Sequence, residues 1–183
     1  MARKICIEVK DFIDDAGHVV LTPIGTVHSP IKEKSEKLPF QSFASDVEGT
    51  IELKREFEPG LDGVEGFSHL FIVFYMHKNR NVKLRTVPLL EEDERGIFGT
   101  RSPSRPNHIG VSTVRLLSRD GRFLKVKGLD IFDGTPILDI KPYVPKVDLV
   151  QGVDNEWLVK KLDKIDSMDE EQKGRIQRNL QGD

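Results

Sequence analysis

Residues 111–129, VSTVRLLSRDGRFLKVKGL, contain two strand-like segments on either side of one tight turn. Residues 111–117 and residues 123–129 are both rich in apolar side chains interrupted by single polar ones or pairs of them, which is typical of half-buried strands. Between them, Asp120-Gly121 supplies the positive φ that tight hairpin turns require. The stretch therefore predicts an antiparallel β-hairpin.

Segments on both sides of this hairpin show strand patterns of their own. They follow one another closely, with turn residues between them and no helix-length segment. We therefore predict a mainly β protein with a single antiparallel sheet that closes, or nearly closes, into a barrel over residues 1–150, rather than a doubly wound α/β sheet. The segments are Ile5, Ile7 and Val9; Ile51 and Leu53; the apolar run HLFIVFYMH at residues 69–77; and the stretch after the break DGTP at residues 133–136.

The pattern changes after Pro145. Trp157, Leu158, Leu162 and Ile165 fall at helical spacing. This spacing predicts short C-terminal helices, so we expect a helical tail over residues 151–183 beside the barrel.

Composition excludes several functional classes. The only cysteine, Cys6, allows neither a disulfide framework nor a Cys-x-x-Cys zinc site, and we expect no metal centre. No apolar window is long enough to span a membrane and the start resembles no signal peptide, so we expect a cytoplasmic protein with no membrane contact. Motifs for dinucleotide binding, phosphate loops, zinc proteolysis and esterase chemistry are also missing.

The net charge of −2 conceals a basic region. Residues 95–127 contain six arginines and two lysines against one acid, directly after the acidic run at residues 91–94. A local excess of this size is typical of a nucleic-acid face, although a solvated basic hairpin is the simpler alternative.

Two further stretches combine turn residues with charged groups. Residues 96–112, GIFGTRSPSRPNHIGVS, present two arginines among prolines, which favours a pre-organised ligand contact over a plain connection. Residues 127–143, KGLDIFDGTPILDIKPY, contain three aspartates. Asp133 is most simply explained by its turn with Gly134, whereas an unpaired Asp130 or Asp139 on a core-facing position is costly.

These motifs resemble those of the YaeB-like (TrmO) family of tRNA N6-threonylcarbamoyladenosine methyltransferases. The likeness covers residues 22–148 and implies a β-barrel methyltransferase, distinct from Rossmann-type enzymes, that uses S-adenosyl-L-methionine and acts as a homodimer on tRNA. The motifs are FSHL at residues 67–70, FGTRSP at 98–103, RPNHIG at 105–110, DGTP at 133–136 and DIKPY at 139–143.

The resemblance also implies which residues hold the cofactor. This sequence departs from the family at two positions, and we expect both departures to change the fit of the substrate. Family members commonly have proline where His108 stands and a basic residue where Phe40 stands. The implied cofactor residues are Pro39, Phe40, Gln41, His77, Arg101, Val111, Lys127, Gly128, Leu129 and Asp130.

Methyl transfer to N6 of threonylcarbamoyladenosine requires loss of a proton from a nitrogen whose lone pair is withdrawn, so a general base is expected. Asp133, His77 and Tyr143 are the candidates. Another nucleotide or a small molecule as methyl acceptor, and a non-catalytic RNA-binding barrel, remain as alternatives. The cations expected to contact tRNA phosphates or the threonyl carboxylate are Arg105, Arg115, Arg119, Arg122 and Lys125.

Overall fold

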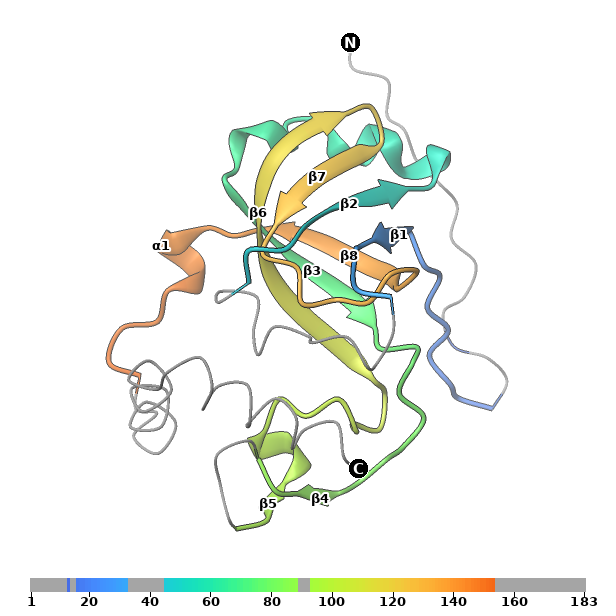
Figure 1. The fold of residues 1–183 in the computed structure, drawn as a ribbon, viewed down its shortest axis with the longest axis vertical. Coiled ribbons are helices and arrows are strands. Elements are labelled where there is room, and N and C mark those ends of the chain that lie inside the picture. Colours follow the sequence, from blue (N-terminus) through green and yellow to red (C-terminus); the bar gives the residue numbers. More distant parts are fainter. Residues whose placement is uncertain (1–12, 14–15, 33–44, 89–92, 154–183) are drawn as a thin grey trace.

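The computed structural model describes residue 13 and residues 16–32, 45–88 and 93–153, which form one closed antiparallel barrel (Figure 1). The strand order around the barrel is β1-β2-β7-β6-β3-β8. The mainly β class and the barrel predicted from the sequence are thus confirmed. The bounds are β1 Gly25–His28, β2 Glu48–Leu53, β3 His69–Tyr75, β6 Ile109–Asp120, β7 Phe123–Lys127 and β8 Pro136–Pro142.

The alternation of the sequence determines which side chains fill the barrel. In β7, Leu124 and Val126 are fully buried while Phe123 and Lys125 are exposed. Successive side chains of a strand point to opposite faces, so each strand contributes every second residue to the interior. The core consists of Val27, Ile51, Leu53, Leu61, Leu70, Ile72, Phe74, Val114, Leu124, Val126, Leu129, Ile131 and Ile137.

The predicted hairpin is confirmed as β6 and β7, joined by a turn in which Gly121 has φ +55°. β6 is longer than expected, because it begins at Ile109 and continues to Asp120. Its pairing with β7 shifts between Leu116 and Ser118, a bulge that bends the long strand around the barrel.

Two groups of connecting residues lie at opposite ends of the barrel (Figure 1). Near the β6–β7 turn lie the 3-10 helices η2 Arg55–Leu61 and η3 Val64–Gly66, and we call this the hairpin end. The other end holds the last residues of β3 and β7 and an excursion between β3 and β6. We call the described residues 77–88 and 93–108 of this excursion the arm, and this end the arm end. The arm contains β4 Arg85–Thr86, β5 Arg95–Gly96 and the 3-10 helix η4 Ile97–Gly99.

Two predictions fall on residues outside those described. The strand at Ile5, Ile7 and Val9 and the helices predicted around Trp157 belong to this group. The last described element is a helical turn, α1 Pro145–Asp148. Within the described part of the chain, no helix has the length and apolar character needed to cross a membrane.

We predict that Gly49→Ala destabilises the barrel. Gly49 pairs with Val126, and an added Cβ would meet the backbone carbonyl oxygen of His28 and the side chain of Leu129. Overpacking of this kind costs about 1 to 3 kcal/mol of unfolding free energy, measurable by urea denaturation. Gly60→Ala is the matched control, because a Cβ there has open space. Equal stability of the two variants would contradict the tight approach of β1 and β2.

Candidate functional site

The ends of three strands bring most of the described cofactor candidates to the arm end. His77 follows the end of β3, Val111 lies near the start of β6, and residues 127–130 form the end of β7 and the segment after it. β3 and β7 both run antiparallel to β6. The last residue of β3 pairs with Ile109 at the start of β6, the last residue of β7 pairs with Arg115 near its middle, and the segment after β7 reaches Ser112 through Asp130. Antiparallel topology therefore assembles residues that are far apart in the sequence.

Ser112 and Asp130 form a short polar contact at this end. The Ser112 hydroxyl donates to Asp130 Oδ1 at 2.5 Å, and Ser112 is itself buried. The neighbouring Val111 points the other way and is 56% exposed. The arm end thus presents a carboxylate held by a buried hydroxyl, close in sequence to an exposed apolar side chain.

The backbone of residues 127–129 is fixed by a short loop before β2. The amides of Gly128 and Leu129 both donate to the carbonyl of Val47, at 3.0 and 3.1 Å. The Ser45 hydroxyl donates to the Leu129 carbonyl at 2.6 Å and accepts from the Val47 amide. Lys127 pairs with Asp46 at 2.6 Å and thereby lowers the pKa of that carboxyl. The segment before Asp130 is therefore held in one conformation.

His77 lies beside the start of β8. A hydrogen bond of 3.3 Å joins its Nδ1 to the Thr135 hydroxyl. Partial burial and, secondarily, the charge of Lys78 lower the pKa of His77 below its ordinary value. Lys78 itself donates to the Lys32 carbonyl and lies 4.8 Å from the centre of the Phe132 ring. The imidazole is consequently neutral near pH 7.

The other two general-base candidates occupy different places. Asp133 Oδ1 accepts from the Ser29 amide at 3.0 Å, and the Asp133 amide donates to Ile31 at 2.7 Å, so this residue shapes its turn close to His77. Tyr143 lies at the opposite end of β3, where its amide donates to His69 and its ring packs edge-on against Phe71 at 5.3 Å. The structure brings His77 and Asp133 to one end and leaves Tyr143 apart.

The two arginines of the proline-rich stretch differ in what they contact. Arg105 Nη1 donates to the carbonyls of Thr100 and Ile97 at 2.7 and 3.2 Å, which braces the arm from within. Arg101 is exposed and forms no ion pair with any described carboxylate. Of these two arginines, Arg101 is therefore the one whose side chain faces the solvent.

The other predicted substrate cations lie on β6 and β7 toward the hairpin end, and most of them are paired there. Arg119 contacts Glu65 at 2.8 Å, and its 17% exposed side chain also donates to the Leu61 carbonyl. Arg122 contacts Glu52 at 2.5 Å and the Leu53 carbonyl at 2.8 Å. Lys125 pairs with Glu48 at 3.0 Å, and Arg115 is exposed. None of these contacts involves His77 or Asp130.

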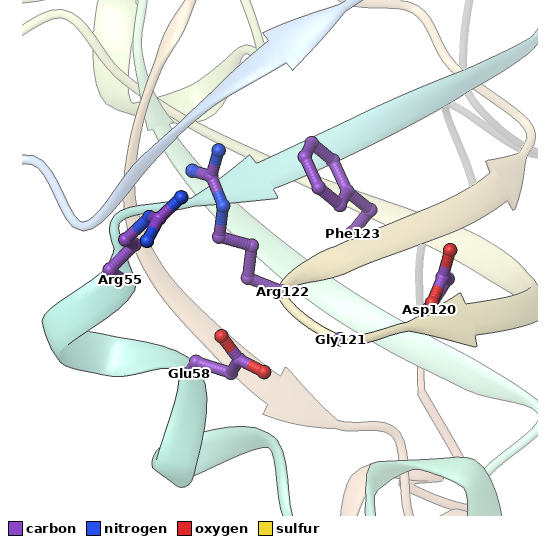
Figure 2. A pocket seen from close by; sticks show the side chains of 6 residues that line it. All are labelled: Arg55, Glu58, Asp120, Gly121, Arg122 and Phe123. Atoms are coloured by element: carbon purple, nitrogen blue, oxygen red, sulfur yellow. The ribbon is translucent and has the colours of Figure 1, made fainter.

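A hollow of about 260 Å³ opens at the hairpin end (Figure 2). Figure 2 shows the guanidinium groups of Arg55 and Arg122 near each other, with the carboxylates of Glu58 and Asp120 also at its edge. Groups of both signs line the same open space. The hollow therefore has no net preference for an anion and contains none of the predicted cofactor residues.

Sequence reasoning missed the residues that orient the candidates. Ser112, Thr135 and Ser45 are buried hydroxyl groups, and no local pattern of the sequence marked them as orienting residues. Pro39, Phe40 and Gln41 lie outside the described residues. Among the residues that are described, no group of His, Cys, Asp and Glu could hold a metal ion.

Comparison with known proteins places this barrel in a family. Residues 26–149 match the model described as the tRNA-methyltransferase O N-terminal domain. The chain is 46% identical over 145 residues to a probable S-adenosyl-L-methionine-binding protein of Pyrococcus abyssi, covering 79% of this chain and 78% of that protein.

Two further relatives extend the comparison. A mouse tRNA (adenine(37)-N6)-methyltransferase is 35% identical over 148 residues, which is 76% of this chain but only 34% of the mouse protein. The crystal structure of TrmO from Pseudomonas aeruginosa superposes with a TM-score of 0.62 at 37% identity, covering 74% of this chain and 60% of that one. With its barrel matched in sequence and in structure, the chain belongs to the tRNA-methyltransferase O N-terminal domain family.

Proposed function

We propose that this chain is an S-adenosylmethionine-dependent tRNA methyltransferase that methylates N6 of the threonylcarbamoyladenosine next to the anticodon. What supports the proposal is that His77, Asp130 and Val111 all belong to the arm end of a barrel of this family, where Asp130 is bound by Ser112 and His77 by Thr135. The names of the relatives support the cofactor and the tRNA substrate. Because the chain spans about a third of the mouse enzyme, the activity of that whole protein remains a proposal for this chain.

The residues at the arm end fit S-adenosylmethionine by their chemistry. Asp130, oriented by Ser112, offers a carboxylate to a ribose hydroxyl or to an ammonium group. Arg101 offers a planar cation to the amino-acid carboxylate, and exposed Val111 offers an apolar contact to adenine. The bound cofactor supplies a methyl group on a positively charged sulfur, which is electrophilic.

His77 is the residue that we propose removes the proton from N6. Its lowered pKa keeps the imidazole neutral at physiological pH, and the Thr135 hydroxyl fixes the ring at Nδ1. Asp133 Oδ1 already accepts a backbone hydrogen bond, and Tyr143 lies at the other end of β3. Alignment of the acceptor nitrogen with the methyl group would supply most of the remaining rate enhancement.

The homodimer and the cytoplasmic location implied by the resemblance and the sequence belong to the same proposal. Several exposed apolar side chains of the arm, among them Val82, Leu84 and Val87, are available for contact with a second copy. Sedimentation of the purified chain at two concentrations measures the oligomeric state directly.

We predict that Ser112→Ala weakens binding of S-adenosylmethionine by about tenfold, because a hydrogen bond to a charged group is lost and Asp130 is no longer held in place. Isothermal titration calorimetry measures the affinity. Asp139→Asn is the control, since Asp139 pairs with Lys141 on β8 and is not among the proposed cofactor residues. Absence of measurable binding to the unsubstituted chain would leave the non-catalytic RNA-binding barrel as the better function.

We predict methyl transfer to tRNA that carries threonylcarbamoyladenosine and little transfer to the same tRNA without the threonylcarbamoyl group. Incorporation of labelled methyl groups, followed by nucleoside analysis, measures both rates. Comparable rates on unmodified tRNA or on free nucleosides would show that another nucleotide or a small molecule is the true acceptor.

We predict an acidic limb in the pH profile of single-turnover methyl transfer. A base with a lowered pKa stays neutral at and above about pH 6.5 and becomes protonated only at lower pH, so the rate falls there. His77→Gln should lower the rate about a hundredfold or more and remove this limb. His69→Gln, at the opposite end of β3, is the matched control. Persistence of the limb in His77→Gln would assign it to another group.

A further inference from the structure

In the described ranges, three of the four predicted substrate cations on β6, β7 and their turn are paired with carboxylates of the same surface, and Arg115 is the exception. Arg119, Arg122 and Lys125 contact Glu65, Glu52 and Glu48. Exposed ion pairs of this kind are weak, so a phosphate can replace a carboxylate as the partner of a cation. The displaced carboxylate would nevertheless stay close to the phosphate and repel it. The surface of β6 and β7 that carries these cations therefore attracts a polyanion less than its sequence suggests.

Two cations of the arm show the opposite arrangement, whereas Arg85 of the arm pairs with Glu94 at 3.1 Å. Arg80 and Lys83 are exposed, and neither has a carboxylate partner within the described part of the chain. Residues 77–108 contain seven basic residues, and their four acids are consecutive at residues 91–94. The segment around Arg80 and Lys83 thus keeps a positive potential.

This segment lies directly beside the loop that carries Arg101. The Lys83 amide donates to the Ser104 carbonyl at 3.0 Å, and the Ile97 amide donates to the Leu84 carbonyl at 2.9 Å. Asn79 also reaches the Ser104 hydroxyl at 3.4 Å. Because the arm begins at His77, its cations extend outward from the proposed active site.

Phe98 adds an aromatic surface to the same part of the arm. Its side chain is 76% exposed, the most of the described exposed aromatic residues, and the Arg105 guanidinium lies 5.8 Å from its ring centre. An exposed ring on the same arm as cations without carboxylate partners is a combination suited to single-stranded nucleic acid, since bases stack on a ring while cations contact phosphates.

We propose that single-stranded RNA of the anticodon loop binds along Arg80, Lys83 and Phe98 of the arm, and not along the β6–β7 hairpin. This inference rests on the proposed function, because it supplies the surface that would deliver the target adenosine to His77. Phosphates of the loop contact the two cations, and one unpaired base stacks on Phe98.

The test compares tRNA binding by two double variants that remove equal charge. Arg80→Ala/Lys83→Ala removes two arm cations, and Arg115→Ala/Lys125→Ala removes two from the barrel wall formed by β6 and β7. Filter binding at several salt concentrations should show that the arm variant loses about tenfold in affinity and about 0.7 in salt slope for each phosphate contact. The hairpin variant, Arg115→Ala/Lys125→Ala, should bind tRNA with nearly the affinity and salt slope of the unsubstituted chain. Phe98→Ser should weaken binding about tenfold without changing the salt slope.

Further measurements separate this inference from the proposed function. Calorimetry with S-adenosylmethionine should give unchanged affinity in all three variants, which shows that the cofactor site is intact. Loss of binding in the hairpin variant alone would overturn the arm surface and leave the methyltransferase proposal standing. Binding of tRNA that depends on the arm, without any methyl transfer, would support the arm surface and overturn the methyltransferase proposal. If Phe98→Ser separates a dimer while tRNA affinity is unchanged, this face binds a second copy and the inference is wrong.

Discussion

Closure of the barrel by β1 is the constraint on which the arrangement of the candidate site depends. This strand of four residues pairs with β2 on one side and β8 on the other. At Gly25 the strands approach so closely that a side chain would meet the backbone of Glu52. Just beyond β1, the Ser29 amide binds Asp133 and the Val27 carbonyl accepts from Gly134. Closure therefore fixes the turn that carries Thr135, and through it the position of His77.

The basic residues of the sequence divide into two groups with different physical roles. Arg119 and Arg122 reach back to the carbonyls of Leu61 and Leu53, where they supply hydrogen-bond donors that η2 and β2 lack at their ends. Their charge serves the fold of the hairpin end. Arg80 and Lys83 make no such contact with the described part of the fold, so their charges remain available to an anionic ligand. Counting charges along the sequence cannot distinguish these groups, because the count does not show which carboxylates lie on the same face of the folded protein.

Local patterns predicted the fold well, whereas the contacts of the site depend on the closed barrel. The β6–β7 hairpin followed from two strand-like segments around Asp120-Gly121, and β3 followed from its continuous apolar run. Both signals are determined within a few residues. The bond between His77 and Thr135 spans 58 positions, and that between Ser29 and Asp133 spans 104. No periodicity encodes such partners, so resemblance to a family indicated His77 and Asp130 while Ser112 and Thr135 emerged only from the structure.

His108 shows how one departure from the family pattern reaches the substrate side. It is buried with φ +50°, a conformation closed to proline, whose ring fixes φ near −65°. Its carbonyl accepts from Met76, its Nε2 lies 3.1 Å from the Asn81 carbonyl, and its ring packs edge-on against Tyr75. A chain with proline here must take another backbone path and loses the imidazole contact to the arm. His108 thus determines how the arm leaves the barrel, and variation at this position changes the surface beside the proposed active site rather than the barrel itself.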